Sequence, residues 1–498
     1  MKNILTAVKA TAILMAGVLL FSCTKTKVVE LTVSPTTVSF QAAGGDQSVS
    51  ITSNDSWTVT KTADWISLSA TSGEGSATLK ITAAENTTLD ARNAEVNIVA
   101  GELARKVTVS QSGQQKAISI GKDKVDMASE GGSIEVPVIS NTSWTVSIPE
   151  EVAWISADKL SGEKDGTVTL TFEKNIYRKG RSAEVVFAAG EGLSVSLPVA
   201  QDLAPISRQT DSLALVAIYN AADGANWKAE RRWDLSTSID KWDGVTVADN
   251  RVTKFQITAA SVIPSEWTMP SEIGDLTELT ILKVNQNKLS GEIPEEIYSL
   301  SKLTDLWLQN DNLSGVISEK LGQLTQLKNF YIDRNTNIAG TIPATIGQLK
   351  KLENINISKT GIGGSIPAEL VGCESLVNFM AYENKLSGQV PDIWDQFTKV
   401  GIIQLYGNPG LEGPLPASCG RATTTAKNYS LRFDGCNFTG NIPESYATLP
   451  SVCKQFWVKN NKLSGVVPEG VQKHANWTNW KAADNILPQQ EGYGLTLE

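Results

Sequence analysis

A repeat of 24 residues in the C-terminal half of the chain constrains the fold more than any other feature. The first clear copy reads Leu279-x-x-Leu282-x-Val284-x-x-Asn287-x-Leu289-Ser290-Gly291-x-Ile293-Pro294. Further copies begin at Leu303, Leu327, Leu352, Leu376 and Val400, then near Asn428 and at Cys453, and a degenerate copy begins at Val252. A unit of this length cannot bury its apolar face alone, so such units stack into a solenoid. The sequence therefore predicts a solenoid over residues 252–475.

Each copy carries two apolar residues separated by one position, which predicts a short strand that points both side chains inward. A polar column follows where the strand turns, and it holds Asn287, Asn335, Asn384, Asn408 and Asn461, with Asp311, Thr360 and Cys436 at equivalent positions. We expect the buried amides to satisfy backbone groups that the turn leaves free. Cys436 is then expected to be a buried thiol rather than a reactive one.

This pattern resembles the plant-type subclass of leucine-rich repeats. Residues 205–251 resemble the N-terminal cap of that subclass without its cysteine pair, because an amphipathic helix leads into Trp-containing turns and a first strand. Residues 476–498 are expected to close the last coil with Trp477 and Trp480, and Tyr493–Leu497 to add a strand. Both ends need such caps, since the terminal coils would otherwise expose their core.

The side chains that flank the inward pair form two columns on the concave sheet. The first column is Lys283, Trp307, Tyr331, Asn356, Met380, Gln404, Arg432 and Trp457. The second is Asn285, Gln309, Asp333, Ser358, Tyr382, Tyr406, Asp434 and Lys459. Strands alone would favour Thr, Val and Ile, which are scarce here, whereas aromatic rings among amides and charges suit recognition. We interpret eleven of these residues as a binding surface for a peptide, protein or glycan: Lys283, Trp307, Gln309, Tyr331, Asp333, Tyr382, Gln404, Tyr406, Arg432, Asp434 and Trp457.

Residues 31–113 and 117–203 are two copies of one module. Short alternating runs divided by Gly, Asn, Asp and Ser turns predict a β-sandwich in each. The matching elements are Gly44-Gly45 and Gly131-Gly132, Ser53-Asn54 and Ser140-Asn141, Trp57 and Trp144, Trp65-Ile66-Ser67 and Trp154-Ile155-Ser156, Arg92 and Arg181, and Gln111 and Gln201.

These motifs together resemble the BACON domain of Bacteroidetes. That resemblance implies an Ig-like sandwich and a proposed carbohydrate-binding role. Trp57 and Trp65 lie in strand-like runs beside Val and Ile, so we expect both rings in the core rather than on a sugar platform. The two modules are therefore expected to act mainly as a stalk.

The N-terminus reads as a targeting segment. Lys2 and Lys9 precede an apolar run from Ala10 to Phe21, which is too short to span a membrane and is typical of a signal peptide. The run ends at Ser22-Cys23, which resembles a bacterial lipobox and implies that residues 1–22 are removed and Cys23 is lipidated. Residues 23–30 would then be a tether. The resemblance implies an outer-membrane lipoprotein of the cell envelope, and it leaves open whether the protein faces the periplasm or the surface.

Composition excludes several function classes. The net charge of −9 without dense basic runs argues against nucleic-acid binding. His474 is the one histidine, so histidine-based metal sites and catalytic triads are hard to build, and we expect His474 to be solvated. No nucleophile elbow or phosphate loop is present. The sequence does not decide whether a disulfide joins two of Cys419, Cys436 and Cys453.

The sequence thus predicts a mainly β protein with an α/β solenoid: two tandem Ig-like β-sandwiches followed by a leucine-rich-repeat domain. We expect a non-enzymatic, lipid-anchored binding protein without cofactor, whose solenoid recognises the ligand. Two alternatives remain: glycan binding by the BACON-like pair with the solenoid as scaffold, and a structural spacer or adhesin. The oligomeric state is left open.

Overall fold

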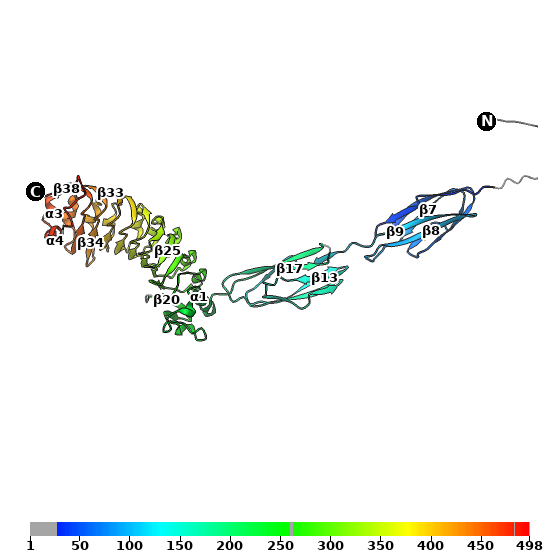
Figure 1. The fold of residues 1–498 in the computed structure, drawn as a ribbon, viewed down its shortest axis with the longest axis horizontal. Coiled ribbons are helices and arrows are strands. Elements are labelled where there is room, and N and C mark those ends of the chain that lie inside the picture. Colours follow the sequence, from blue (N-terminus) through cyan, green and yellow to red (C-terminus); the bar gives the residue numbers. More distant parts are fainter. Residues whose placement is uncertain (1–26, 191, 259–261, 483, 498) are drawn as a thin grey trace, which may run out of the picture.

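The computed structural model describes residues 27–190, 192–258, 262–482 and 484–497. Two β-sandwiches and a curved solenoid follow one another in a row (Figure 1), which confirms the predicted mainly β architecture. Cys23 and the predicted signal peptide lie outside the described residues. Within the described ranges, no helix is both long and apolar enough to cross a membrane.

The first sandwich packs a four-stranded sheet, in the order β1-β3-β7-β5, on a five-stranded sheet, in the order β2-β9-β8-β4-β6. Its strands are β1 (Leu31–Ser34), β2 (Thr37–Phe40), β3 (Gly45–Ser53), β4 (Ser56–Lys61), β5 (Ile66–Leu68), β6 (Ser72–Glu74), β7 (Ala77–Ala83), β8 (Arg92–Ala100) and β9 (Leu103–Gln111). Alternate residues face inward, as the two-residue period requires. All pairs are antiparallel except β2 with β9, the last strand of the domain, which run parallel.

The second sandwich repeats this arrangement, with sheets ordered β10-β12-β16-β14 and β11-β18-β17-β13-β15. Its strands are β10 (Ile118–Ile120), β11 (Val125–Met127), β12 (Gly132–Ser140), β13 (Ser143–Ser147), β14 (Ile155–Ala157), β15 (Ser161–Glu163), β16 (Gly166–Phe172), β17 (Arg181–Ala188) and β18 (Ser194–Gln201). Here too an early strand, β11, runs parallel to the last strand, β18. The duplication seen in the sequence is therefore a duplication of topology.

The tryptophans of the sandwiches divide into two kinds. Trp57 is buried, as predicted, and its indole Nε1 donates to the Gly75 carbonyl at 2.9 Å. Trp65, which was also expected in the core, is only partly buried: it packs against the core and lies under Arg92, whose Cζ is 4.5 Å from the ring centroid. Arg92 in turn donates from Nε to Oε1 of Gln111 at 2.9 Å.

The same brace recurs in the second sandwich. The guanidinium of Arg181 lies 4.4 Å from the Trp154 ring and donates to Gln201 at 2.7 Å. A cation held over an indole by a buried amide is a stabilising arrangement. The paired Trp, Arg and Gln of the sequence duplication therefore form one structural unit in each domain.

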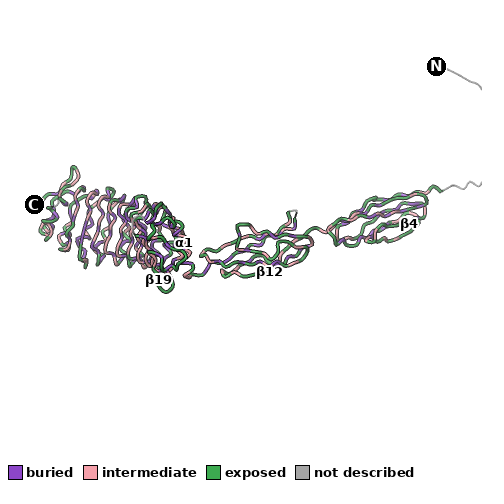
Figure 2. Tube along the Cα trace, turned by 60° about the horizontal axis from the view of Figure 1, so that its bottom comes forward, coloured by how far each residue is buried: buried purple, intermediate pink, exposed green. Residues whose placement is uncertain are grey.

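The solenoid is built on a ten-stranded concave sheet, parallel except for its first pair, β19 with β20. Its strands in order are β19 (Val245–Ala248), β20 (Arg251–Ile257), β22 (Ile281–Val284), β24 (Asp305–Trp307), β26 (Asn329–Tyr331), β28 (Asn354–Asn356), β30 (Asn378–Met380), β32 (Ile402–Gln404), β34 (Tyr429–Arg432) and β36 (Cys453–Trp457). One apolar core runs the length of the coils, seen as the buried interior of the solenoid in Figure 2.

Further short strands form two smaller sheets on the other side of the coils, in the orders β21-β23-β25-β27 and β29-β31-β33-β35-β37-β38. Their bounds are β21 (Trp267–Thr268), β23 (Leu289–Glu292), β25 (Asn312–Val316), β27 (Asn337–Ala339), β29 (Gly363–Gly364), β31 (Lys385–Gln389), β33 (Gly410–Pro414), β35 (Asn437–Gly440), β37 (Lys462–Val466) and β38 (Gly494–Thr496). The coils are completed by η3 (Ser271–Asp275), η4 (Glu295–Ser299), η5 (Glu319–Gln323), η6 (Ala344–Gln348), η7 (Ala368–Gly372), η8 (Trp394–Gln396), α2 (Ser418–Arg421) and η9 (Glu444–Thr448).

The N-terminal cap is helix α1 (Arg208–Ala221), followed by η1 (Gly224–Asn226) and η2 (Ile239–Lys241). Ser207 and Thr210 form a capping box at the start of the helix. Asp211 is fully buried and accepts two hydrogen bonds from Arg251, at 2.6 and 2.9 Å, and one from the Val252 amide at 2.8 Å. This charge pair joins the cap helix to the first coil.

The C-terminal cap consists of α3 (Glu469–Gln472), α4 (Trp477–Ala482) and the strand β38, which pairs with β37. Trp480 is buried, and its Nε1 donates to the Cys453 carbonyl. The prediction that His474 is solvated is wrong. Its ring stacks on Trp480 at 4.3 Å, Nδ1 accepts the Asn476 amide, and Nε2 donates to the Leu449 carbonyl at 2.8 Å.

The asparagine column lies where the sequence places it. The Asn384 amide donates to the carbonyls of Ile357 and Ala381, and its Oδ1 accepts from the amide and hydroxyl of Thr360. Asn335, Asn408 and Asn461 make equivalent bonds between adjacent coils. Each side chain therefore joins two coils through backbone groups, as predicted.

The cysteines of the solenoid are free. Cys373, Cys419, Cys436 and Cys453 are all buried, and no disulfide joins any of them. Cys436 occupies the asparagine column as a buried thiol, and burial raises its pKa to about 12. The sequence-based interpretation of Cys436 as unreactive is thus confirmed, and the open question of a disulfide is answered in favour of thiols.

We expect Asn384→Leu to lower the free energy of unfolding by about 1–3 kcal/mol, because it leaves buried backbone groups in two coils without hydrogen-bond partners. Chemical denaturation followed by circular dichroism measures this loss. The exposed Asn479→Leu in α4 is the control and should change stability by less than about 0.5 kcal/mol. Equal stability of Asn384→Leu and the wild type would contradict the bridging role.

Asp311 is the one carboxylate in the asparagine column. Its Oδ1 accepts the amides of Asn287 and Leu289, at 2.8 and 3.2 Å. Its Oδ2 is buried without a hydrogen-bond partner among the described residues. Burial raises the pKa of Asp311 to about 6, although the backbone amides oppose the shift. An asparagine would place a donor where Oδ2 now lies.

Asp311→Asn should therefore stabilise the protein at pH 8. The folded state holds its proton up to about pH 6, whereas the unfolded chain loses it near pH 4, so native stability falls between these values and is flat above. The variant avoids that loss, and we expect a gain of about 1–3 kcal/mol at pH 8 that shrinks by pH 4. Denaturation curves at both pH values measure it, and a pH-independent difference would contradict the titration.

Candidate functional site

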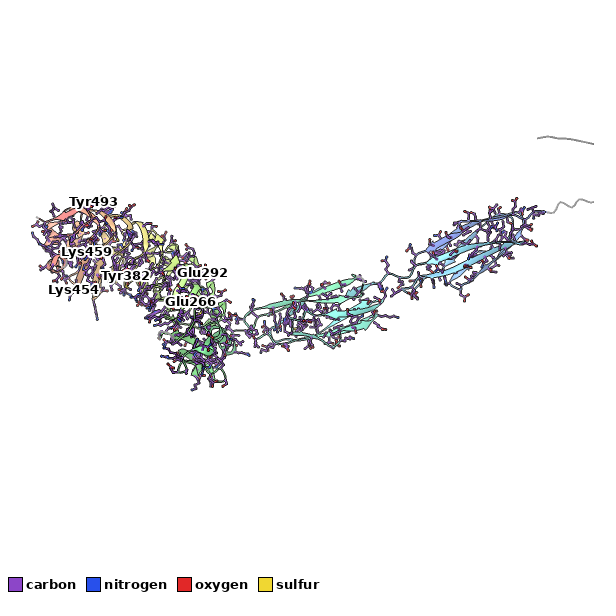
Figure 3. The ribbon with its side chains drawn as sticks, viewed as in Figure 1. Glu266, Glu292, Tyr382, Lys454, Lys459 and Tyr493 are labelled. Carbon is purple, nitrogen blue, oxygen red and sulfur yellow. The ribbon has the colours of Figure 1, made fainter. Side chains whose placement is uncertain are left out.

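The predicted columns of the concave sheet lie in register across neighbouring strands. Backbone pairing places Lys283 beside Trp307, Trp307 beside Tyr331, and Tyr331 beside Asn356. The same pairing continues through Met380, Gln404 and Arg432 to Trp457. In Figure 3 the concave strand bearing Lys454 lies at the lower edge of the solenoid end, and Tyr493 at the upper edge.

The aromatic residues form two separate clusters. The N-terminal cluster is Lys283, Trp307 and Tyr331: the rings lie 4.8 Å apart edge to face, and the Lys283 ammonium lies 3.6 Å above the indole. Burial raises the pKa of Tyr331, and the charges of Asp305 and Asp333 add to the shift. The phenol therefore lies near two carboxylates.

The C-terminal cluster is Tyr382, Tyr406, Arg432 and Trp457. The tyrosine rings stack at 4.4 Å with only 7° between their planes. The Arg432 guanidinium lies 3.7 Å from the Tyr406 ring and 4.0 Å from Trp457, so it is held between two rings. Two hydrogen bonds to Asp434 at 3.0 and 3.2 Å fix its orientation.

The five aromatic rings of the two clusters are less exposed than their place on the concave face suggests. Each ring is half-buried, because its neighbours in the column cover it. Burial, with the adjacent Tyr382, raises the pKa of Tyr406 to about 12. None of the five rings belongs to the apolar core of the solenoid.

The two clusters are separated along the columns. Asn356, Met380 and Gln404 continue the first column between them, and the buried Ser358 continues the second. The eleven residues predicted for the surface therefore share one face, but they do not form one strip. Gln404 borders the C-terminal cluster, where it pairs with Arg432, and Gln309 and Asp333 flank the N-terminal one.

Four buried polar atoms around the N-terminal cluster have no hydrogen-bond partner among the described residues: Asn285 Oδ1, Trp307 Nε1, Gln309 Oε1 and Asp333 Oδ1. A buried polar group without a partner costs about 1–3 kcal/mol. Stability of the fold does not account for four such atoms in three adjacent coils. This end of the concave face therefore has buried polar atoms whose hydrogen bonds the described residues do not supply.

A third column, missed in the sequence, runs beside the first. Asn329 donates from its amide to Asp305 at 2.9 Å, Asn354 donates to Asn329 at 2.7 Å, and Asn378 donates to Asn354 at 2.5 Å. The signal was available, since these residues recur two positions before the first column. This head-to-tail ladder is a continuous row of polar side chains beside the aromatic column of the concave face.

Among the described residues, the sandwich tryptophans form no cluster like those of the concave face, and Tyr177 of the second sandwich is a single exposed ring. Trp57 and Trp144 are buried, and a side chain at Gly73 or Gly162 would collide with their rings, so glycine backbone covers them. Trp65 and Trp154 each carry an arginine on one face. Among the described residues, no group of His, Cys, Asp and Glu side chains is arranged to hold a metal ion.

Comparison with protein families gives two matches. Residues 55–112 match the BACON family model, whose description is "Putative binding domain, N-terminal". Residues 117–204 match the model named "Viral BACON domain". The search among curated proteins found no match.

Among solved structures, the solenoid is similar to a plant receptor-kinase ectodomain with leucine-rich repeats, GASSHO1/SCHENGEN3 of Arabidopsis thaliana in complex with CASPARIAN STRIP INTEGRITY FACTOR 2 (23% identity, 53% of this chain, TM-score 0.49). The chain spans about a third (31%) of that ectodomain. A plant ice-binding protein is also similar (24% identity, 54% of this chain, 91% of that one, TM-score 0.43). The Arabidopsis receptor kinase HAESA in complex with the peptide hormone IDA and the co-receptor SERK1 is similar as well (24% identity, 44% of this chain, 40% of that one, TM-score 0.39).

These TM-scores lie below 0.5, and the solenoid is identified by its own repeat and strand register. The family matches, in contrast, cover most of both sandwiches. The chain therefore carries two BACON domains in tandem, followed by a leucine-rich-repeat solenoid.

Proposed function

We propose that this protein is a non-enzymatic binding protein whose concave solenoid face takes an extended segment of polypeptide. The observation that carries the proposal is the arrangement of the two ring clusters. Lys283 lies over one face of Trp307, and Tyr382 and Arg432 cover the two faces of Tyr406. A sugar ring stacks on a free aromatic face, so these clusters favour contacts at ring edges instead.

The rest of the face supports a polypeptide ligand. The ladder from Asp305 to Asn378 supplies amide and carboxylate groups along four consecutive strands. A main chain carries a donor and an acceptor on almost every residue, so an extended segment can bond to such a row. Rigid half-buried rings beside it lose little rotamer entropy on binding and are suited to anchor side chains.

The stalk and anchor complete the proposal. The tandem BACON domains hold the solenoid away from the membrane, and a lipid on Cys23 anchors the chain to the outer membrane of the cell envelope. Support for the stalk role comes from the sandwich tryptophans, which are buried or covered by arginine. Glycan binding by the sandwiches would need such a ring to be free.

The double variant Trp307→Ala, Tyr406→Ala tests the binding face. A displayed library of random peptides is selected against the full protein, and a recovered peptide is titrated by calorimetry. We expect the double variant to weaken binding at least a hundredfold, because both clusters lose an anchor ring. The melting temperature should fall only modestly, since neither ring lies in the apolar core.

The control variant is Tyr177→Ala, Tyr493→Ala, which removes two exposed tyrosines outside the concave face. Its affinity should equal that of the wild type. If the selected peptides bind the concave-face variant unchanged, recognition lies elsewhere on the protein. If glycan-coated beads offered in parallel capture the protein and no peptide is selected, the ligand class is wrong.

Cys23→Ala tests the anchor. We expect the variant to leave the membrane fraction and to lose incorporation of radiolabelled palmitate, because it lacks the thiol that would carry the lipid. Thr24→Ala keeps the cysteine and should stay membrane-bound. A Cys23→Ala protein that still sediments with membranes after a high-salt wash would show that another attachment holds it.

A further inference from the structure

The N-terminal cluster combines an aromatic face that accepts a cation with acceptor oxygens that lack donors. Lys283 lies 3.6 Å above the Trp307 ring, so this indole already binds an ammonium group of the protein itself. No ion pair joins Lys283 to another described residue. The ring is therefore the main partner of this cation.

The acceptor oxygens are aligned beside the ring. Asn285, Gln309 and Asp333 occupy the same column position in three successive coils, and each has a buried oxygen without a partner. Asp333 is only 7% exposed. Its other oxygen lies 3.7 Å from Arg334 Nε, too far for a hydrogen bond, and the Arg334 side chain is 57% exposed. The carboxylate charge is thus weakly compensated.

A second carboxylate lies on the opposite side of the rings. Asp305 stands in the ladder column, two positions before the aromatic column, and accepts from Asn329 and Thr304. Strand pairing sets Trp307 beside Tyr331 and Asp305 beside Asn329, so the carboxylate column borders the ring column, and burial first, then the charges of Asp305 and Asp333, raise the pKa of Tyr331. Aromatic rings between acidic groups attract a cation both electrostatically and through the ring face.

We propose that this end of the concave face is a subsite for a basic side chain, lysine or arginine, of the bound polypeptide, and that Lys283 occupies its aromatic face until the ligand displaces it. The incoming cation lies on Trp307 and donates to Asp333 and Gln309. Rotation of these two side chains toward the ligand costs little, because their free oxygens give up no hydrogen bond. The inference rests on the proposed function and names the residue class that the ligand presents.

The C-terminal cluster differs in this respect. Arg432 already fills the space between Tyr406 and Trp457, and Asp434 neutralises it with two hydrogen bonds. A second basic side chain would meet a satisfied guanidinium there. At the C-terminal cluster the cation and its hydrogen bonds are therefore already supplied by the protein. At the N-terminal cluster, buried acceptor oxygens still lack hydrogen-bond donors.

The test uses the full protein labelled with 5-fluorotryptophan, with the Trp307 resonance assigned from Trp307→Phe. N-acetyl-arginine amide and N-acetyl-lysine amide are titrated at millimolar concentration, with the uncharged N-acetyl-citrulline amide for comparison. We expect the basic probes to shift the Trp307 signal saturably and the citrulline probe to leave it unchanged.

Three variants make the assignment specific. Lys283→Met removes the competing cation and should raise the affinity for both basic probes about fivefold. Asp333→Asn should lower it at least tenfold while leaving the melting temperature unchanged or higher, since the buried carboxylate oxygen has no partner to lose. Lys459→Met, which alters the lysine 5.9 Å from Trp457 in the other cluster, should change nothing at Trp307.

An equal response to citrulline, or an unchanged affinity in Lys283→Met, would overturn the cation subsite. These outcomes are separable from failure of the proposed function. Selected peptides that depend on Trp307 and Tyr406 but carry no basic residue would keep the binding face and reject the subsite. Saturable binding of the basic probes without any peptide capture would keep the subsite and reject the polypeptide ligand.

Discussion

The solenoid depends on one side-chain interaction, the bridge that a buried asparagine makes between the backbones of two coils. Each coil turns sharply after its concave strand, and the turn leaves amides and carbonyls inside the molecule that water cannot reach. Asn384 and its equivalents satisfy these groups in two coils at once. Because the bridge sets how neighbouring coils stack, it also sets the register of the concave columns, and with it every contact of the candidate site.

Much of this architecture could be predicted from the sequence because spacing determines it. A period of 24 residues and an inward apolar pair specify which residues face the core, which face the concave side and which fall in the bridging column. The side chains whose burial differs from the prediction depend on side-chain contacts that the repeat spacing does not specify. Trp65 packs against the core but is only partly buried, with Arg92 over its ring, and His474 is half-buried because the ring of Trp480 stacks on it. Neither partner can be inferred from local pattern.

The candidate site was also predictable only in part. The repeat spacing predicted which residues lie in its columns, but it did not predict how far the rings are buried or which side chains cover them. Sequence shows that Tyr406 and Arg432 are neighbours on one face, but only the rotamers show that the guanidinium lies between two rings and bonds to Asp434. The ladder from Asp305 to Asn378 was overlooked because Asn also occupies the bridging column, so a second polar series did not stand out.

The topology of the stalk has a mechanical consequence. In each sandwich an early strand runs parallel to the last strand, β2 beside β9 and β11 beside β18. When a tensile load pulls the two ends of such a domain apart, parallel strands slide past each other, and all the hydrogen bonds between them bear the force at once. A hairpin loaded at its open end would instead peel apart bond by bond. Two domains in series with this shear geometry resist unfolding when a load is applied along the chain.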